Sequence, residues 1–329
     1  VVAQARFSHP ARCPFGQAKV DLLAIAVPVR RENNGPATSG RRIVNLDAHC
    51  GPGADAMGRH TTGGNCMTTS QALAKPTAAQ TEHFDVLIVG AGISGVGAAY
   101  HLTHQRPGTT FVVLEALDNF GGTWWTHKYP GIRSDSDLYT FGYRFKPWTS
   151  APIATAEEIL KYMGEVIDEN DLGKHIRYQH KILSAKWSTA DKQWTIEAQR
   201  TDTGEKRTFT ANFLWMCQGY YRHSEGYTPE WPGMDQYEGL IVHPQSWPED
   251  LDYKGKRVIC IGSGATTATV VPAIAADCEH VTVLQRSPTY FIPGRNVNDL
   301  ADTLRELQID ESWIHEIVRR RILHDQAAF

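Results

Sequence analysis

Two glycine-rich stretches of the chain have residue types and spacing that suit a dinucleotide. The first is GAGISG, residues 90–95, which follows the apolar run FDVLIV and precedes a helical pattern. In this context the first glycine permits a tight turn, the second lets the backbone approach a pyrophosphate, and the third lets the helix pack closely on the strand. The helix N-terminus then presents unpaired N–H groups and a favourable dipole to the phosphates.

A carboxylate stands where the ribose of this nucleotide is expected. Glu115 ends the next apolar run, TFVVLEA, twenty residues after Gly95. A carboxylate at that place accepts hydrogen bonds from ribose hydroxyls and repels a 2′-phosphate. The first site therefore suits an adenosine with free ribose hydroxyls, such as that of FAD. The alternative is a solvated glutamate at the end of a strand.

The second glycine-rich stretch is GSGATT, residues 262–267, which follows the apolar run KRVICI. Its third position is Thr267, where glycine or alanine is usual, so we expect a looser contact between helix and strand. The following strand ends in Arg286, nineteen residues after Thr267, instead of an acid. A guanidinium can pair bidentately with a 2′-phosphate, which favours NADPH at this site. The alternative is a surface arginine.

Each glycine stretch must lie between a buried strand and a helix. Near-continuous apolar runs predict strands buried on both faces of a parallel sheet, and each is followed by a helical pattern. A further helix is expected with Thr155 as N-cap and Glu158 closing a capping box. Alternating runs between 176 and 210 predict antiparallel strands laid across the first unit. The expected strands are 84–89, 110–116, 256–265 and 280–287, and the expected helices are 94–104, 156–169 and one ending near 276.

The sequence thus predicts an α/β fold of two interleaved Rossmann-like dinucleotide-binding domains, one for FAD and one for NADPH, of which the second is incomplete. Residues 1–83 are rich in Gly, Pro, Arg and Ala, so we expect a disordered or poorly ordered extension. Met67 is a plausible natural N-terminus, and a genuine low-complexity extension is the alternative. The other predicted parts are an FAD-binding domain at 84–236, a linker at 237–254 and a partial NADPH-binding domain at 255–329.

The composition excludes several classes of function. The chain has 329 residues, of which 41% are hydrophobic, and 33 basic against 36 acidic residues give a net charge of −3. This balance gives no reason to expect nucleic-acid or membrane partners. The six cysteines form no CxxC pair and no zinc spacing, so we expect reduced thiols, no metal site and a cytoplasmic protein. The apolar run VDLLAIAVPV lacks the flanks of a secretory signal and the length of a membrane span.

Two dinucleotide sites in one chain imply electron transfer from a nicotinamide to a flavin. A disulfide reductase built in this way needs a pair of cysteines near the flavin. After Glu115 the chain has no cysteine until Cys217, which stands alone. We therefore expect the reduced flavin to react with oxygen.

The segment between the two glycine stretches resembles the signature of Baeyer–Villiger monooxygenases. It reads YEGLIVHPQSWPED, residues 237–250, with tyrosine where that family usually has phenylalanine. The segment GGTWWTHKYPGIRSD, residues 121–135, is similar to the flavin-side segment of the family, which carries GGTW, YPG and a downstream aspartate. The strings SEGYTPEW and LQRSPTY are most similar to the ethionamide-activating type of that family. The signature positions are Tyr237, Gly239, His243 and Trp247.

The resemblance implies a reaction. In that family NADPH reduces FAD, O2 then forms a C4a-peroxyflavin, and one oxygen atom is inserted beside the carbonyl of a small ketone or onto sulfur. Asp135 is implied as the catalytic residue of this chain, at the border between flavin and nicotinamide; the alternative is that Asp135 caps a helix. His243 and Trp247 are implied as a structural element that couples domain motions.

The resemblance also implies a set of cofactor contacts. Those to FAD are Gly90, Gly92, Ser94 and Gly95 at the pyrophosphate, Glu115 at the ribose, Thr123 and Trp124 at the flavin, Arg133, Ser134 and Asp135 at the border with nicotinamide, and the backbone of Ile182 at the adenine. Those to NADPH are Gly262, Ser263, Gly264, Ala265, Thr266, Thr267 and Ala268, with Arg286 and Ser287 at the 2′-phosphate. Trp125 has packing as its alternative.

The family's catalytic arginine lies in a segment beyond the last residue of this chain. One expectation is therefore an FAD-dependent, NADPH-using monooxygenase whose sequence is a fragment or is completed elsewhere. One alternative is a truncated, non-catalytic product that at most binds FAD. The other is a plain NAD(P)H:FAD oxidoreductase, which leaves the signature at 237–248 unexplained.

Overall fold

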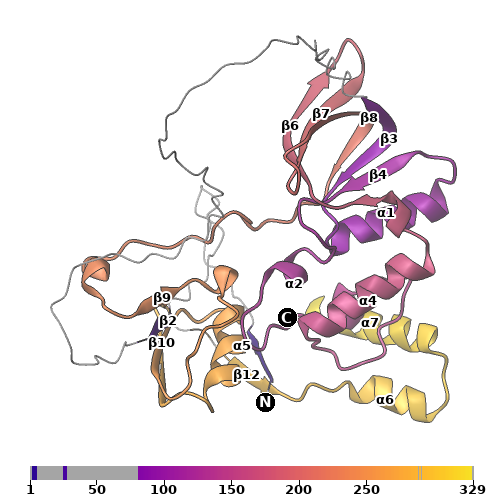
Figure 1. Ribbon diagram of the computed structural model, residues 1–329. Helices are drawn as coiled ribbons and strands as arrows, with labels where there is room; N and C mark the ends of the chain where they lie inside the picture. The colour runs from indigo at the N-terminus through magenta and orange to yellow at the C-terminus, as the bar shows by residue number, and fades with distance from the viewer. Residues whose placement is uncertain (1, 6–24, 28–80, 288, 290, 328–329) are drawn as a thin grey trace, which may run out of the picture. The chain divides into compact units, whose positions relative to one another are not determined.

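The computed structural model of the chain describes residues 2–5, 25–27, 81–287, 289 and 291–327 (Figure 1). The chain divides into two compact units, and one of them, Arg31–Ala78, lies outside the described residues. Most of the extension predicted at 1–83, including Met67, lies outside them as well. Its described part holds two short strands, β1 at Val2–Ala5 and β2 at Ile25–Val27, which the sequence did not predict.

The first glycine stretch belongs to a six-stranded sheet with the strand order β5-β4-β3-β8-β7-β6 (Figure 1). β3 pairs in parallel with β4 and β8, and β4 pairs in parallel with β5. β6, β7 and β8 are antiparallel neighbours. The elements are β3 (Glu82–Val89), α1 (Ile93–Gln105), β4 (Phe111–Leu114), β5 (Ile176–Arg177), β6 (His180–Ser188), β7 (Gln193–Arg200) and β8 (Lys206–Met216).

The pairing of β8 corrects the prediction that the antiparallel strands lie across the first unit. β8 pairs along β3 from Phe209 to Met216, so the antiparallel strands extend the parallel sheet instead. This gives the backbone of β3 a hydrogen-bonding neighbour on each side, which a buried strand needs. Phe209 and Ala211 of β8 are fully buried against this sheet together with Leu87 of β3.

Helix α4, Ala156–Glu169, has the bounds that the sequence predicts. The Thr155 hydroxyl accepts a hydrogen bond from the Glu158 N–H at 3.3 Å, and the Glu158 carboxylate accepts one from the Thr155 N–H at 2.8 Å. This capping box satisfies donors that would otherwise be free at the first turn. Ile159 and Met163, four residues apart, are fully buried on the face that packs on the first core.

The second glycine stretch belongs to a four-stranded sheet with the order β11-β10-β2-β9. β10 and β11 are parallel and are joined through helix α5, as the sequence predicts. β2 pairs antiparallel with both β10 and β9. Val258, Cys260, Val270, Ile274 and Trp247 form the core beside this sheet. The elements are β9 (Leu240–Val242), β10 (Arg257–Ile261), α5 (Ala265–Ile274) and β11 (His280–Leu284).

The last two helices, α6 (Asp299–Glu306) and α7 (Glu311–Ala327), share the core of α1 and α4. Ala301 of α6 and Ile314 of α7 are fully buried in that cluster. The sequence assigns these helices to the domain at 255–329 and does not predict this contact. In the part of the chain that the structure describes, no helix has the length and apolar character that a membrane span requires. The remaining elements are α2 (Thr123–Thr126), α3 (Leu138–Phe141), β12 (Phe291–Gly294), which pairs with β1, and three short 3-10 turns.

Candidate functional site

The first glycine stretch forms the turn between β3 and α1. Gly90 has a φ of +95°, which side chains rarely allow, and its N–H donates to the Leu114 carbonyl at 2.8 Å. A Cβ atom on Gly90 would lie 2.8 Å from the Cys217 carbonyl oxygen. A Cβ atom on Gly95 would lie 1.8 Å from the Gly90 carbonyl oxygen, so helix and turn touch there. Both positions therefore require glycine.

The N-terminus of helix α1 is open to an anion. Gly92 precedes the helix, and no side chain of the described residues caps it. Ser94 is exposed in the first turn. The free N–H groups of an uncapped first turn and the helix dipole both favour a phosphate. Because Gly92 has no Cβ, a pyrophosphate can approach this backbone closely, so the residues present fit a dinucleotide.

Glu115 is fixed against the same turn. One carboxylate oxygen accepts a hydrogen bond from the Ala91 N–H at 2.7 Å, and the other accepts one from the Leu117 N–H at 2.9 Å. The residue is only 7% exposed, so the alternative of a solvated glutamate is wrong. Each oxygen keeps a second lone pair, which can accept a ribose hydroxyl.

The glycine pair at 121–122 lies against the first glycine stretch. The Gly121 N–H donates to the Ala91 carbonyl at 3.0 Å. Gly122 has a φ of +54°, and a Cβ atom on it would lie 3.2 Å from the Gly92 Cα. A Cβ atom on Gly121 would lie 2.3 Å from the Leu160 side chain. Two glycine stretches in contact leave a strip of backbone without side chains, which a flat ligand can approach.

Thr123 and Trp124 begin helix α2 directly after this glycine pair. Trp124 is partly buried against the first core, with its ring 6.0 Å from that of Phe141 at an angle of 76°. Trp125 points elsewhere, because its indole N–H donates to the Asp118 carboxylate at 2.9 Å and the Lys128 ammonium lies 4.3 Å from its ring centre. These contacts agree with packing as the role of Trp125.

The segment with Arg133, Ser134 and Asp135 is held by backbone bonds. The Ser134 N–H donates to the Ala154 carbonyl at 2.8 Å, and its buried hydroxyl accepts from the Ala154 N–H at 3.1 Å. The Arg133 guanidinium donates to the Gly131 carbonyl at 3.0 Å. Asp135 is exposed and accepts a hydrogen bond from the Ser136 hydroxyl at 3.3 Å. The fixed neighbours thus present an unburied carboxylate.

The alternative that Asp135 caps a helix is wrong. The N-cap of α3 is Asp137, whose carboxylate accepts a hydrogen bond from the Thr140 N–H at 2.9 Å. Capping is therefore done two residues later, and the Asp135 side chain remains available for another role.

Ile182 lies on a strand that starts beside Glu115. The His180 N–H donates to the Glu115 carbonyl at 2.7 Å, which fixes the start of β6 at the end of β4. Ile182 follows two residues later and pairs with Ala198, and the register shifts between Ile182 and Ser184. The structure therefore brings Ile182 to the same end of the sheet as Glu115, and its contact with adenine stays a prediction.

The second glycine stretch repeats the bond pattern of the first. Gly262 has a φ of +132°, and its N–H donates to the Leu284 carbonyl at 2.8 Å. Gly264 precedes α5, and among the described residues no side chain caps this helix. Thr267, at the third position, is buried. The Ser263 hydroxyl donates to the Ser287 carbonyl at 3.2 Å, so the stretch is tied to the segment after β11.

Arg286 and Ser287 follow β11 and are exposed. Within the described ranges, the Arg286 guanidinium makes no ion pair or hydrogen bond. The structure brings this guanidinium to the segment that Ser263 holds next to the second glycine stretch. The arrangement suits a 2′-phosphate, and the alternative of a surface arginine remains open.

The YPG turn, residues 129–131, packs on helix α5. Gly131 has a φ of +74°, and a Cβ atom on it would lie 2.8 Å from the Ala273 Cβ and 3.0 Å from the Thr269 carbonyl oxygen. Tyr129 also packs against the core of the second sheet. The turn after the flavin-side glycines therefore packs on α5, the helix that follows the second glycine stretch.

Aromatic and histidine side chains gather around this turn. The His127 ring lies 6.0 Å from the ring of Tyr129 and 5.3 Å from that of Tyr221. Burial lowers the pKa of His127, whose Nδ1–H donates to the Thr123 carbonyl at 3.0 Å. Burial raises the pKa of both tyrosines, and the Asp135 carboxylate adds to each rise. Sequence reasoning missed His127, Tyr129 and Tyr221; the YPG string was the available signal.

His243 of the signature is a partly buried packing residue. Its Nδ1 accepts a hydrogen bond from the Gln245 N–H at 3.1 Å, so the proton sits on Nε2, which is buried and has no partner among the described residues. Its ring covers Gly226, where a Cβ atom would lie 2.1 Å from the ring. Burial, then the nearby His127, lowers the pKa of His243. A neutral, closely packed imidazole fits the structural role implied for it.

The other signature residues also pack. Trp247 is buried in the core of the second sheet, with its ring 6.2 Å from that of Tyr253. Tyr237 is 39% exposed, and its ring covers Gly239, where a Cβ atom would lie 2.3 Å from the phenol oxygen. A Cβ atom at Gly239 would therefore displace the outer end of an exposed ring and no backbone.

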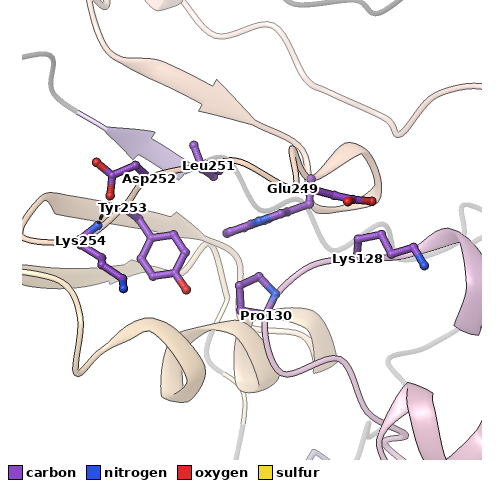
Figure 2. A pocket seen from close by; sticks show the side chains of 8 residues that line it. Lys128, Pro130, Glu249, Leu251, Asp252, Tyr253 and Lys254 are labelled. Carbon is purple, nitrogen blue, oxygen red and sulfur yellow. Dashed lines mark hydrogen bonds between the residues drawn. The ribbon is translucent and has the colours of Figure 1, made fainter.

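A surface cavity of about 500 Å³ lies beside the YPG turn (Figure 2). Its charged lining contains two lysines and two carboxylates, and no residue predicted to bind a cofactor lines it. The cavity is therefore separate from both glycine stretches. It is lined by Lys128, Pro130, Trp247, Glu249, Leu251, Asp252, Tyr253 and Lys254.

Two family models match consecutive parts of the chain. Residues 88–150, with the first glycine stretch, match the NAD(P)-binding Rossmann-like domain. Residues 151–300, with the signature and the second glycine stretch, match the flavin-binding monooxygenase-like family. The matched parts thus contain both glycine stretches.

Three curated relatives show how far this similarity extends. The FAD-containing monooxygenase EthA of Mycolicibacterium smegmatis is 54% identical over 213 residues, which are 64% of this chain and 43% of that protein. EthA of Mycobacterium tuberculosis is 46% identical over 250 residues, 75% of this chain and 50% of that protein. The probable FAD-binding monooxygenase AlmA of Acinetobacter baylyi is 46% identical over 242 residues, 73% and 48% of the two chains. The chain spans about half the length of these relatives.

Two solved structures have the same fold over the aligned part. An oxidized steroid monooxygenase bound to NADP is 34% identical, with a TM-score of 0.58 over 71% of this chain and 43% of that chain. A cyclohexanone monooxygenase bound to epsilon-caprolactone is 30% identical, with a TM-score of 0.61 over 73% of this chain and 46% of that chain. Both solved proteins are monooxygenases.

Proposed function

The chain belongs to the flavin-binding monooxygenase-like family, and we propose that it carries the FAD and NADPH sites of a monooxygenase of the Baeyer–Villiger type. One observation carries this proposal. The two glycine turns share the same backbone hydrogen bond to the next strand, but the residues that follow those two strands differ in charge. The first turn is followed by a buried carboxylate, Glu115, and the second by an exposed guanidinium, Arg286. This difference separates an adenosine with free ribose hydroxyls from one with a 2′-phosphate.

FAD binds at the first turn in this proposal. The amides at the start of α1 hold the pyrophosphate, and Glu115 accepts the ribose hydroxyls while its N–H donors from the turn keep it in place. The bare backbone of Gly92 and Gly122 lets the flavin approach, and Trp124 supplies a flat wall. When bound, FAD supplies the redox chemistry that transfers one oxygen atom of O2 to the substrate.

NADPH binds at the second turn. The amides in the first turn of α5 hold its pyrophosphate, and Arg286 with Ser287 holds its 2′-phosphate. The motif that brings Thr123 and Trp124 to the flavin continues to Asp135, which lies close enough to Tyr129 and Tyr221 to raise the pKa of both phenols. We place Asp135 where the nicotinamide meets the flavin, because Tyr129 reaches α5 from the same segment.

The proposed substrates are small ketones or sulfur-containing compounds together with O2. The signature at 237–248 supports this class, and so do the names of the solved relatives, a steroid monooxygenase and a cyclohexanone monooxygenase. A second candidate is an FAD-binding portion that does not turn over by itself. This candidate is tested as well, because the chain covers only about half of the length of its relatives.

One experiment separates these candidates. The chain is purified with FAD, its visible flavin absorbance is recorded, and NADPH and NADH are added with and without oxygen. We expect bound flavin, bleaching by NADPH in preference to NADH, and an ester or sulfoxide product from an added ketone or thioether. Glu115→Ala is the matched variant that should lose the flavin.

Each outcome has a definite meaning. Colourless protein that binds no FAD refutes the proposal for the first turn. Bleaching that yields only hydrogen peroxide, measured with catalase and an oxygen electrode, supports a plain NAD(P)H:FAD oxidoreductase. Bound FAD without bleaching by either nucleotide supports the portion that does not turn over by itself.

A further inference from the structure

The loop that carries Asp135 is tied to a later segment of the chain at both of its ends. Before Asp135, the Ser134 N–H donates to the Ala154 carbonyl at 2.8 Å, and the Ser134 hydroxyl accepts from the Ala154 N–H at 3.1 Å. After Asp135, the Leu138 N–H donates to the Pro152 carbonyl at 2.8 Å. The position of the Asp135 backbone therefore depends on the segment from Pro152 to Ala154.

Ile153, between those two residues, bonds to a different part of the chain. The Asn296 amide oxygen accepts a hydrogen bond from the Ile153 N–H at 2.8 Å, and the Asn296 NH2 group donates to the Ile153 carbonyl at 2.9 Å. This pairing fixes the orientation of the amide, because the reverse orientation would set donor against donor. The Asn296 side chain thus supplies the donor and the acceptor that a neighbouring strand would supply.

Ile153 needs this partner because it lies in the interior. The residue is only 9% exposed, and Ala154 beside it is fully buried. A backbone N–H or carbonyl group that is buried without a partner is costly, so such groups are paired or reach water. Without Asn296 the segment would have to open toward water, and the bonds to Ser134 and Leu138 would loosen with it.

Asn296 itself is held in place by the helix that follows it. It lies between β12 and α6, 143 positions after Ile153. Two residues later, the Asn298 side chain caps α6 by accepting a hydrogen bond from the Ala301 N–H at 3.0 Å. Ala301 is fully buried in the first core, so α6 fixes the place from which Asn296 reaches Ile153.

We propose that Asn296 is a positioning residue for Asp135, because its paired amide completes the hydrogen bonding of Ile153 and thereby fixes the loop that presents the Asp135 carboxylate. The inference rests on the role proposed for Asp135 where the nicotinamide meets the flavin. Asn296 touches neither cofactor. It affects the reduction of flavin by NADPH only through the placement of Asp135, since a small misplacement at a reacting centre slows a reaction strongly.

A double-mutant cycle tests this placement. Asn296→Ala removes both bonds to Ile153, and Asp135→Asn removes the charge that is to be placed. The rate at which NADPH bleaches the FAD-loaded chain without oxygen is measured by stopped flow for both variants and for their combination. We expect Asn296→Ala alone to slow bleaching about ten- to a hundredfold, and to cause no further slowing beside Asp135→Asn.

The matched control is Asn298→Ala. It makes the same substitution two residues away and removes the cap of α6, which lowers stability, but it leaves the bonds to Ile153 in place. We expect Asn298→Ala to leave the rate of bleaching unchanged, and the absorbance of the bound flavin to be the same in every variant. Equal slowing by Asn296→Ala in both backgrounds, equal slowing by Asn298→Ala, or an unchanged rate in Asn296→Ala overturns the proposal.

Hydrogen exchange distinguishes failure of the proposed function from failure of the positioning. If NADPH does not bleach the wild-type chain, or if Asp135→Asn has no effect, the role given to Asp135 is refuted, and exchange then decides the contact. Asn296→Ala should speed exchange in peptides that cover 132–138 about five- to 150-fold, the range expected when a buried N–H group loses its acceptor, and Asn298→Ala should not. Unchanged exchange in Asn296→Ala refutes the positioning of this loop.

Discussion

Replacing Glu115 by glutamine tests the role of its carboxylate with a single substitution. The substitution keeps the size of the side chain and turns one carboxylate oxygen into an NH2 group. Both oxygens now accept backbone N–H groups, from Ala91 at 2.7 Å and Leu117 at 2.9 Å. An amide has only one acceptor oxygen, so one of these N–H groups would face another donor.

The size of the effect follows from these two bonds. A buried N–H group left without an acceptor costs about 1–3 kcal/mol, and the other bond loses the extra strength of a charged acceptor, about 1 kcal/mol. We therefore expect Glu115→Gln to lower the free energy of unfolding by about 2–4 kcal/mol. The loss of a charged acceptor for the ribose hydroxyls should weaken FAD binding about 10- to 150-fold, since such a bond contributes about 1.5–3 kcal/mol.

Two measurements check this prediction. Urea unfolding followed by tryptophan fluorescence gives the change in stability, and flavin fluorescence quenching gives the affinity for FAD. Glu157→Gln is the matched control, because Glu157 is an exposed glutamate on α4, outside the site. If Glu115→Gln unfolds at the same urea concentration as the wild-type chain and binds FAD equally well, the role given to Glu115 is wrong.

Three further predictions concern the rest of the site and the fold. Gly95→Ala places a Cβ atom 1.8 Å from the Gly90 carbonyl oxygen and should cost about 3 kcal/mol of unfolding free energy in urea titrations, whereas Gly173→Ala, with its nearest neighbour at 3.8 Å, should be near neutral. Arg286→Gln should weaken NADPH binding about tenfold or more and leave NADH binding unchanged in calorimetry; equal losses for both nucleotides would contradict a 2′-phosphate contact. Burial lowers the pKa of His315, so the unfolded chain takes up its proton first as the pH falls below about 6.5. Stability should therefore fall toward pH 5 by at most about 1.4 kcal/mol per pH unit from this residue, and His315→Leu should flatten that slope in urea titrations at several pH values.

Much of the fold could be predicted because its strongest signals are local. β3 and β4 hold near-continuous apolar runs, and β4 is buried throughout, as such a run predicts. For β10 the prediction of burial on both faces is wrong, because Val258 and Cys260 are buried while Ile259 between them is exposed. The start of α4 could be placed to the residue, because Thr155 and Glu158 carry the two halves of a capping box within one turn.

The missed features depend on contacts between distant residues. The pairing of β8 with β3 joins residues more than a hundred positions apart, and no local pattern names the partner of a strand. The docking of α7 on the first core is likewise fixed by tertiary contacts, such as the bond from the Trp148 N–H to the His315 imidazole at 3.2 Å. The same holds for Tyr129, whose string YPG announces a turn without naming the helix against which it packs.

The N-cap of α3 is a further feature that the local sequence could not place. Two aspartates, Asp135 and Asp137, lie before an apolar stretch, and either has the side chain of an N-cap. The structure selects Asp137, because Leu138 and Tyr139 must begin α3 in order to be buried. The sequence interpretation considered only Asp135 as a cap, and the burial of the following residues places the cap at Asp137 instead.

The two glycine turns are so similar in their backbone that, in the proposed sites, side chains must discriminate between FAD and NADPH. In both turns the first glycine donates to the last residue of the next strand at the same distance of 2.8 Å, and among the residues that the structure describes no side chain caps either of the following helices. A backbone that is equal in these respects offers equal binding to any pyrophosphate. In the proposed sites discrimination is left to the residues that follow the strands. These are Glu115, directly after β4 and held by the turn, and Arg286, two residues after β11. Exchanging the charge at either place should change which nucleotide binds there without changing the turn.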